Sequence, residues 1–164
     1  MTTVAPVMPR LNVRLTVYDT VGGIPMFLLL KNGYWQTPQG GVETETRNET
    51  VFEAAFRELW EETRLLPYEI RRTGFETEYD AYRDGEPIHV ISVDCIVGCD
   101  HYDPVEIGLS GDKHVEYAWM SFENAYRHLD RFPEQRKAFV ADCLEGKLVS
   151  EERVNLAAIS DLAA

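Results

Sequence analysis

The hydrophobic and polar residues near the start of the chain alternate strictly. Over residues 11–18 every second residue is aliphatic, which is the period-2 pattern of a half-buried β-strand. A Gly22-Gly23 pair then precedes an apolar stretch at 24–30, so the sequence predicts a hairpin of two strands. Residues 31–41 contain three glycines and one proline and are expected to form a loop.

A helical pattern follows this loop. Over residues 50–63, Phe52, Phe56 and Leu59 fall on one side of a helical wheel, with Trp60 at its edge. Three glutamates fall roughly opposite this apolar side, namely Glu58, Glu61 and Glu62. The pattern predicts an amphipathic helix that ends before Pro67.

The second half of the chain predicts an antiparallel strand pair and then helices. The strands are expected at 72–82 and 88–97 around a turn at 83–86, followed by a short strand at 115–121. Helices are expected at 122–129 and 133–146, and residues 148–164 form a tail that is helical or frayed. Mixed strands followed by helices indicate an α/β (α+β) protein, an α/β/α sandwich around a mixed sheet. We expect one domain over residues 1–147 with a C-terminal tail at 148–164.

The net charge of the chain disfavours one class of binding partner. Asp and Glu number 28 against 16 Lys and Arg, which gives a net charge of −12. So acidic a surface repels phosphate backbones, and a partner of long nucleic acid is therefore not expected. Of this charge, −5 lies between residues 41 and 62, where seven acidic residues accompany two basic ones.

Membrane and secretory signals are absent from the sequence. No apolar stretch approaches the length of roughly 18–20 residues that a membrane span requires. The first ten residues lack the basic start and apolar core of a signal peptide. Cys95, Cys99 and Cys143 show no CxxC spacing, which favours reduced, packed thiols in a cytoplasmic protein.

The glutamates of the helix at 50–63 predict a metal site. Glu58, Glu61 and Glu62 stand at i, i+3 and i+4, so their side chains share one face. Like charges at this spacing destabilise a helix unless they are compensated, and Arg57 supplies only part of the compensation. A hard cation such as Mg²⁺ or Mn²⁺ would supply the rest, and a solvated acidic face is the alternative.

The order of residues in this segment resembles the signature box of the Nudix hydrolases. The residues that match in type and spacing are Glu49, Arg57, Glu58, Leu59, Glu61, Glu62 and Leu65. There are two departures from the family pattern. Two extra residues separate Gly41 from Glu49, and Arg64 replaces the final glycine of the box. Both departures affect the expected loop and helix end, and neither removes a carboxylate.

The resemblance implies a Nudix-type α/β/α sandwich and a Mg²⁺- or Mn²⁺-dependent hydrolase. It implies that Glu58, Glu61 and Glu62 bind the metal and that Arg57 orients carboxylates through Glu49. Glu49 would be a further ligand or the base that acts on water, so the catalytic residues are Glu49, Arg57 and Glu61. An acidic residue from a later loop would join them, and Asp112 and Glu116 are the candidates.

The substrate implied by the resemblance is a nucleoside diphosphate linked to another group. A nucleoside polyphosphate such as diadenosine tetraphosphate or a (deoxy)nucleoside triphosphate is expected. Dihydroneopterin triphosphate and RNA 5′-pyrophosphate are alternatives, and a non-catalytic nucleotide-binding module is an alternative of another class. Trp35, Gly40, Gly41 and Lys31 are the substrate-binding candidates, with the two glycine amides and the first turn of the helix near an anion. Whether the protein is a homodimer is left open.

Overall fold

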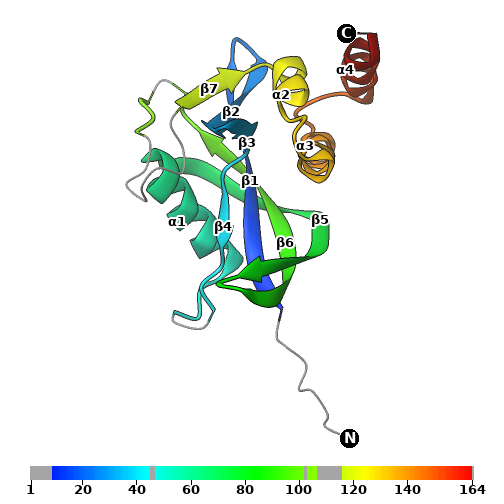
Figure 1. Ribbon diagram of the computed structural model, residues 1–164. Coiled ribbons are helices and arrows are strands. Elements are labelled where there is room, and N and C mark those ends of the chain that lie inside the picture. The colour runs from blue at the N-terminus through cyan, green and yellow to red at the C-terminus, as the bar shows by residue number, and fades with distance from the viewer. Residues whose placement is uncertain (1–8, 45–46, 102, 107–115, 164) are drawn as a thin grey trace, which may run out of the picture.

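A computed structural model shows a mixed β-sheet between two layers of helices (Figure 1). The structure describes residues 9–44, 47–101, 103–106 and 116–163. The long strands are β1 (Arg10–Val21), β2 (Ile24–Asn32), β5 (Pro67–Arg83) and β6 (Glu86–Cys99). The short strands are β3 (Tyr34–Gln36), β4 (Gln39–Gly41) and β7 (Glu116–Met120). The helices are α1 (Val51–Thr63), α2 (Phe122–His128), α3 (Pro133–Glu145) and α4 (Glu151–Ala163).

The sheet combines antiparallel hairpins with one parallel pair. Its order is β3-β2-β1-β6-β5, with β4 added to β1 and β7 added to β2. Strands β1 and β6 run parallel, and the other pairs are antiparallel. Both predicted hairpins are present, turning at Gly22-Gly23 and at Asp84-Gly85, where all four residues have positive φ. This mixed sheet confirms the predicted α+β class.

The expected loop at 31–41 contains two short strands. Strand β3 pairs with β2, and β4 pairs with β1 through Asn12–Arg14. Their sequences, YWQ and QGG, are too short to show a strand pattern, so only the pairing with long neighbours identifies them as strands. Strand β4 brings Gly40 and Gly41, two of the predicted substrate-binding residues, beside α1.

Two hydrophobic clusters fill the two faces of the sheet. On one face Val13 and Leu15 of β1 pack with Leu59 of α1. On the other face Phe27 packs with Phe122 of α2 and Phe139 of α3, whose rings stack at 5.5 Å. Helix α4 closes this side, since Arg153 pairs with Glu123 of α2 and Asp161 pairs with Arg136 of α3.

The prediction that β1 is half-buried is wrong, because helices cover both of its faces. The polar positions Arg14 and Thr16 point toward α3 and are 5% and 0% exposed. The Arg14 guanidinium contacts Asp94 of β6 and lies 3.1 Å from Asp142 of α3. Thr16 and Thr73 donate hydrogen bonds of 2.7 and 2.8 Å to the same Asp142 carboxylate. The polar residues that alternate with apolar ones in β1 therefore belong to a buried polar network and do not contact water.

None of the helices that the structure describes is both long and apolar enough to cross a bilayer. The cysteines Cys95, Cys99 and Cys143 are buried and free, as the absence of CxxC spacing indicates.

Candidate functional site

Helix α1 is capped at both ends, by Thr50 at its start and by Arg64 at its end. Thr50 caps the start, accepting a hydrogen bond from the Glu53 amide while the Glu53 side chain accepts one from the Thr50 amide. Arg64 ends the helix in the left-handed conformation, with φ of 59°. The arginine thus adopts the backbone geometry for which glycine is preferred, and its guanidinium lies 5.2 Å from the Trp60 ring centroid.

Of the apolar side of the predicted wheel, only Leu59 is buried. Phe52, Phe56 and Trp60 are 50%, 45% and 41% exposed. The buried residues are Ala54, Ala55, Leu59, Glu62 and Thr63. Small alanines let the helix approach the sheet closely, so the alanine face packs inward and the large rings are left outside. This rotation turns Glu58 and Glu62 toward the protein instead of away from it.

Arg57 connects the carboxylates that the sequence predicted to act together. Its Nε and Nη2 donate hydrogen bonds of 2.8 and 2.9 Å to the two oxygens of Glu49, which form a bidentate pair. Its Nη1 lies 2.8 Å from Glu58 Oε1 and 3.1 Å from Glu61 Oε2. Its Nη2 also donates to the carbonyl of Gly41 at 2.7 Å. The structure therefore brings Glu49, Arg57, Glu58 and Glu61 together, with Arg57 at their centre.

Glu58 occupies a confined place between α1 and β4. Its side chain is 12% exposed. A Cβ atom on Gly40 would lie 2.0 Å from the Glu58 carboxyl carbon, so only glycine leaves room for this carboxylate. Burial raises the pKa of Glu58 to about 7, and Glu62 and Glu61 add to the rise against the opposing effect of Arg57. The site holds negative charge that a further cation would stabilise.

The other box carboxylates differ in exposure. The Glu61 side chain is 44% exposed and reaches Arg57 from the solvent side of the helix. Glu62 is 6% exposed and stands one turn after Glu58, to which it is electrostatically coupled. The three glutamates thus present one exposed, one partly buried and one buried carboxylate along the same edge of α1.

The two-residue insertion lies in a loop closed by Glu43 and Glu49. The amide of Glu43 donates to the Glu49 side chain, and the amide of Glu49 donates to the Glu43 carbonyl, both at 3.0 Å. Asn48 takes positive φ to complete the loop. Because Arg57 is its strongest partner, the Glu49 carboxyl has a pKa below its ordinary value. The insertion therefore leaves the pairing of Glu49 with Arg57 intact.

The substrate-binding candidates fall into two places. Gly40 and Gly41 lie on β4 against Glu58 and Arg57, in the middle of α1 rather than at its first turn. The first turn is closed by its own capping box and carries Glu53. The expectation of an anion near this turn stays a prediction. Lys31 and Trp35 lie on the β2–β3 hairpin and line a separate hollow.

The two later acidic candidates also differ. Glu116 is the partner of Lys31 across the β2–β7 pair, at the start of β7. Asp112 lies outside the described residues. Neither is therefore shown beside the box carboxylates.

Sequence reasoning missed two groups of residues. Asp19, Asp100 and His101 lie where β1 and β6 end side by side, with ligand atoms within 4.8 Å of one another. These residues come together because β1 and β6 pair in parallel, and no local sequence pattern reveals that pairing. Arg127, His128 and Arg131 line the same hollow as Lys31, and they carry no motif.

Comparison with known proteins gives a consistent result. The model of the NUDIX domain matches residues 8–143. An RNA pyrophosphohydrolase of Psychrobacter cryohalolentis is 34% identical over 74 residues, which is 45% of this chain and 41% of that protein. The chain therefore matches less than half the length of the curated relatives it resembles.

Solved structures that resemble the fold include the following two. The NUDIX domain of Shewanella oneidensis NrtR, complexed with ADP ribose, superposes with a TM-score of 0.67 at 15% identity, covering 87% of this chain and 90% of that one. A C. elegans Ap4A hydrolase in a binary complex superposes with a TM-score of 0.58 at 21% identity, covering 80% and 93%. At these identities the likeness concerns the fold alone.

Proposed function

Since the chain belongs to the Nudix family, we propose that it is a Mg²⁺- or Mn²⁺-dependent pyrophosphohydrolase that cleaves a nucleoside diphosphate linked to another group. The observation that carries the proposal is the Glu58 carboxylate, confined between α1 and Gly40 beside a cluster of further carboxylates. The proposed substrate is a nucleoside polyphosphate such as diadenosine tetraphosphate or a (deoxy)nucleoside triphosphate.

The residues present fit a hard divalent cation. All three donors, Glu58, Glu61 and Glu62, offer carboxylate oxygens, which Mg²⁺ and Mn²⁺ prefer. The space that Gly40 leaves for Glu58 and the raised pKa of Glu58 both indicate a site in which added positive charge is favourable. A bound cation would neutralise the substrate phosphates and lower the pKa of a coordinated water.

Glu49 and Arg57 have proposed roles beside this cation. Arg57 holds both oxygens of Glu49 in a fixed orientation. Because its pKa is lowered, Glu49 is deprotonated at neutral pH and can accept a proton from water or bind a metal. Arg57 is a positioning residue, since it acts through the carboxylates that it holds.

A second candidate function is removal of pyrophosphate from the 5′ end of RNA. The sequence match to RNA pyrophosphohydrolases supports it, over the part of the chain that is aligned. The net charge of −12 disfavours binding of long RNA, so small nucleoside polyphosphates remain the preferred substrates. Because the cysteines are buried free thiols, we also infer a cytoplasmic location.

The test is hydrolysis of a substrate panel in the presence of Mg²⁺. The panel comprises diadenosine tetraphosphate, deoxynucleoside triphosphates, dihydroneopterin triphosphate and 5′-triphosphorylated RNA. Glu61→Gln should lower the rate at least about 100-fold, since even residues that only support metal ligands cost 10–100-fold. Glu152→Gln, an exposed glutamate on α4, is the matched control. If nothing is hydrolysed, or if Glu61→Gln matches the control, the catalytic proposal is wrong and a binding module is favoured.

A further inference from the structure

Large side chains form a continuous row along the outer side of α1. Phe52, Phe56, Trp60 and Arg64 follow one another at intervals of four residues, so they lie next to each other on the helix surface. The Arg64 guanidinium belongs to the row because it lies 5.2 Å from the centroid of the Trp60 ring. Rows with this spacing are the ridges by which helices pack into each other's grooves. We call these four residues the aromatic ridge.

The aromatic ridge faces away from the rest of the protein. Strands β1, β4 and β5 pack on the inner side of α1, and the other helices lie across the sheet (Figure 1). The three rings of the ridge are between 41% and 50% exposed. Single exposed apolar residues are ordinary on a protein surface, whereas adjacent exposed rings indicate an interaction site. The described part of the chain therefore leaves the ridge open to a partner.

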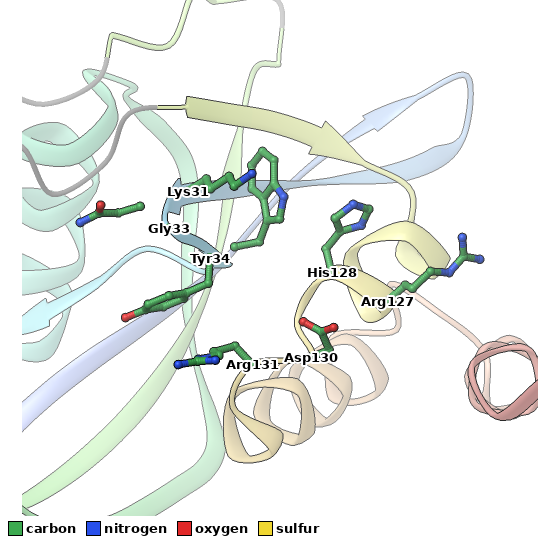
Figure 2. A pocket seen from close by; sticks show the side chains of 9 residues that line it. Lys31, Gly33, Tyr34, Arg127, His128, Asp130 and Arg131 are labelled. Atoms are coloured by element: carbon green, nitrogen blue, oxygen red, sulfur yellow. The ribbon is translucent and has the colours of Figure 1, made fainter. Parts of the chain in front are cut away.

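Both candidate ligand sites lie away from the aromatic ridge. The Glu58 carboxylate lies against Gly40 of β4, on the inner side of α1. The hollow that Lys31 and Arg131 line is on the sheet face that α2 and α3 cover (Figure 2). A partner seated on the ridge therefore leaves both sites uncovered.

The charges beside the ridge favour a second copy of the chain in an antiparallel arrangement. Glu53 is exposed in the first turn of α1, and Arg64 caps its last turn. They are about 16 Å apart along the helix axis. A two-fold axis between Phe56 and Trp60 places each Arg64 beside the Glu53 of the second copy, and each Phe56 against a Trp60. A parallel arrangement would bring like charges together instead.

The area of the ridge indicates how strong such a dimer is. An aromatic side chain buries about 150–250 Å² when it is fully covered, so three half-exposed rings offer roughly 270 Å² per copy. Two ridges together supply roughly 540 Å² of apolar centre, and the charged side chains beside them add a polar rim. Stable interfaces bury about 1,200–2,000 Å² in total, and weak ones bury less. The expected dimer is therefore weak, with a dissociation constant of about 1–100 μM.

We propose that the aromatic ridge is the interface of a homodimer in which two α1 helices pack antiparallel. A membrane surface fits the ridge less well, because anionic lipids repel a chain with a net charge of −12. The inference does not depend on the proposed function, since neither metal nor substrate takes part in the contact.

Analytical ultracentrifugation without metal or substrate tests the dimer. The unaltered protein should dissociate in the micromolar range. The double variant Phe56→Gln/Trp60→Gln should raise the dissociation constant at least about tenfold, since large apolar side chains at the centre of an interface carry most of its binding free energy. The matched control is Leu156→Gln/Ile159→Gln on α4, whose side chains are 55% and 61% exposed. It should leave the dissociation constant unchanged.

Three results would overturn the inference. One is a protein that stays monomeric at concentrations above the expected range, which would leave the ridge to a different partner. Another is an equal dissociation constant in the ridge variant. The third is a control variant that dissociates as readily as the ridge variant, which would assign the interface to α4. Circular dichroism and urea unfolding establish that each variant is folded.

A second pair of variants tests the antiparallel arrangement without removing a ring. Arg64→Glu places like charges opposite each other and should raise the dissociation constant at least about threefold. Adding Glu53→Lys should reverse this effect, because each pair then has opposite charges again. The antiparallel dimer is overturned if Arg64→Glu has no effect, or if Glu53→Lys does not restore association.

Discussion

The substitution Gly40→Ala tests whether the position of the Glu58 carboxylate controls activity. The added methyl carbon would lie 2.0 Å from the Glu58 carboxyl carbon and 2.2 and 2.3 Å from its oxygens. Carbon atoms in contact are about 3.5 Å apart, so the carboxylate must move by about 1.5 Å. Since these atoms are the far end of a flexible side chain, Glu58 can rotate away without moving the backbone.

The effects on stability and on activity should therefore differ in size. The free energy of unfolding should change by less than about 1 kcal/mol, because replacing glycine also restricts the unfolded chain. A displacement of about 1 Å in a reacting group can lower a rate about 100-fold, so kcat/KM should fall by at least that factor. The Mg²⁺ concentration for half-maximal rate should rise as well.

Gly41→Ala is the matched control on the same strand. A Cβ there meets no atom within 4 Å, and the carbonyl that accepts from Arg57 is retained. Steady-state hydrolysis with a Mg²⁺ titration should separate the two variants by at least about 100-fold, and urea unfolding should find both stable. The reasoning is refuted if the two variants have equal activity, or if Gly40→Ala loses several kcal/mol of stability.

Three other predictions concern the fold and its charges. Arg14→Met leaves buried carboxylates without their cation and should cost about 3–5 kcal/mol in urea unfolding; a loss below 1 kcal/mol would contradict the buried network. Arg64→Gly relieves the left-handed backbone but loses the contact with Trp60, so the net gain should be about 0.5–1 kcal/mol, and an unchanged melting temperature would contradict this. The hydrogen bonds that the His89 ring donates to Asp80 and to Glu78 raise the pKa of His89 above 6.5, so NMR titration should show this rise and Asp80→Asn should reduce it. The stabilising contribution of His89 is full below pH 6.5 and is lost as pH rises through the raised pKa; a pKa at or below 6.5 would contradict the contacts.

Local patterns predicted the long elements well. The alternation of β1, the glycine pair after it and the proline and glycine around α3 each depend on neighbouring residues in the chain. The contact of Arg57 with Glu49 was also predicted, because the resemblance to the Nudix box implies it. These features need no knowledge of distant contacts.

Features that depend on distant contacts were not predictable in this way. Which face of α1 is buried is decided by how closely the alanines approach the sheet, and hydrophobicity alone favours the rings of Phe52 and Phe56. The burial of Arg14 depends on Asp142, 128 residues further along the chain. The hollow that Lys31 and Arg131 both line joins segments more than 90 residues apart.

In many metal proteins the folding of the site and the binding of the metal ion are one event. The contacts of Arg57 separate these two events. Its guanidinium supplies the positive charge that Glu49, Glu58 and Glu61 need in order to lie close together during folding. This region therefore has its own internal counter-charge, and binding of the proposed metal ion would be a later, reversible exchange of partners. A chelator should switch such a protein off without unfolding it, and returning the metal ion should restore activity without a refolding step.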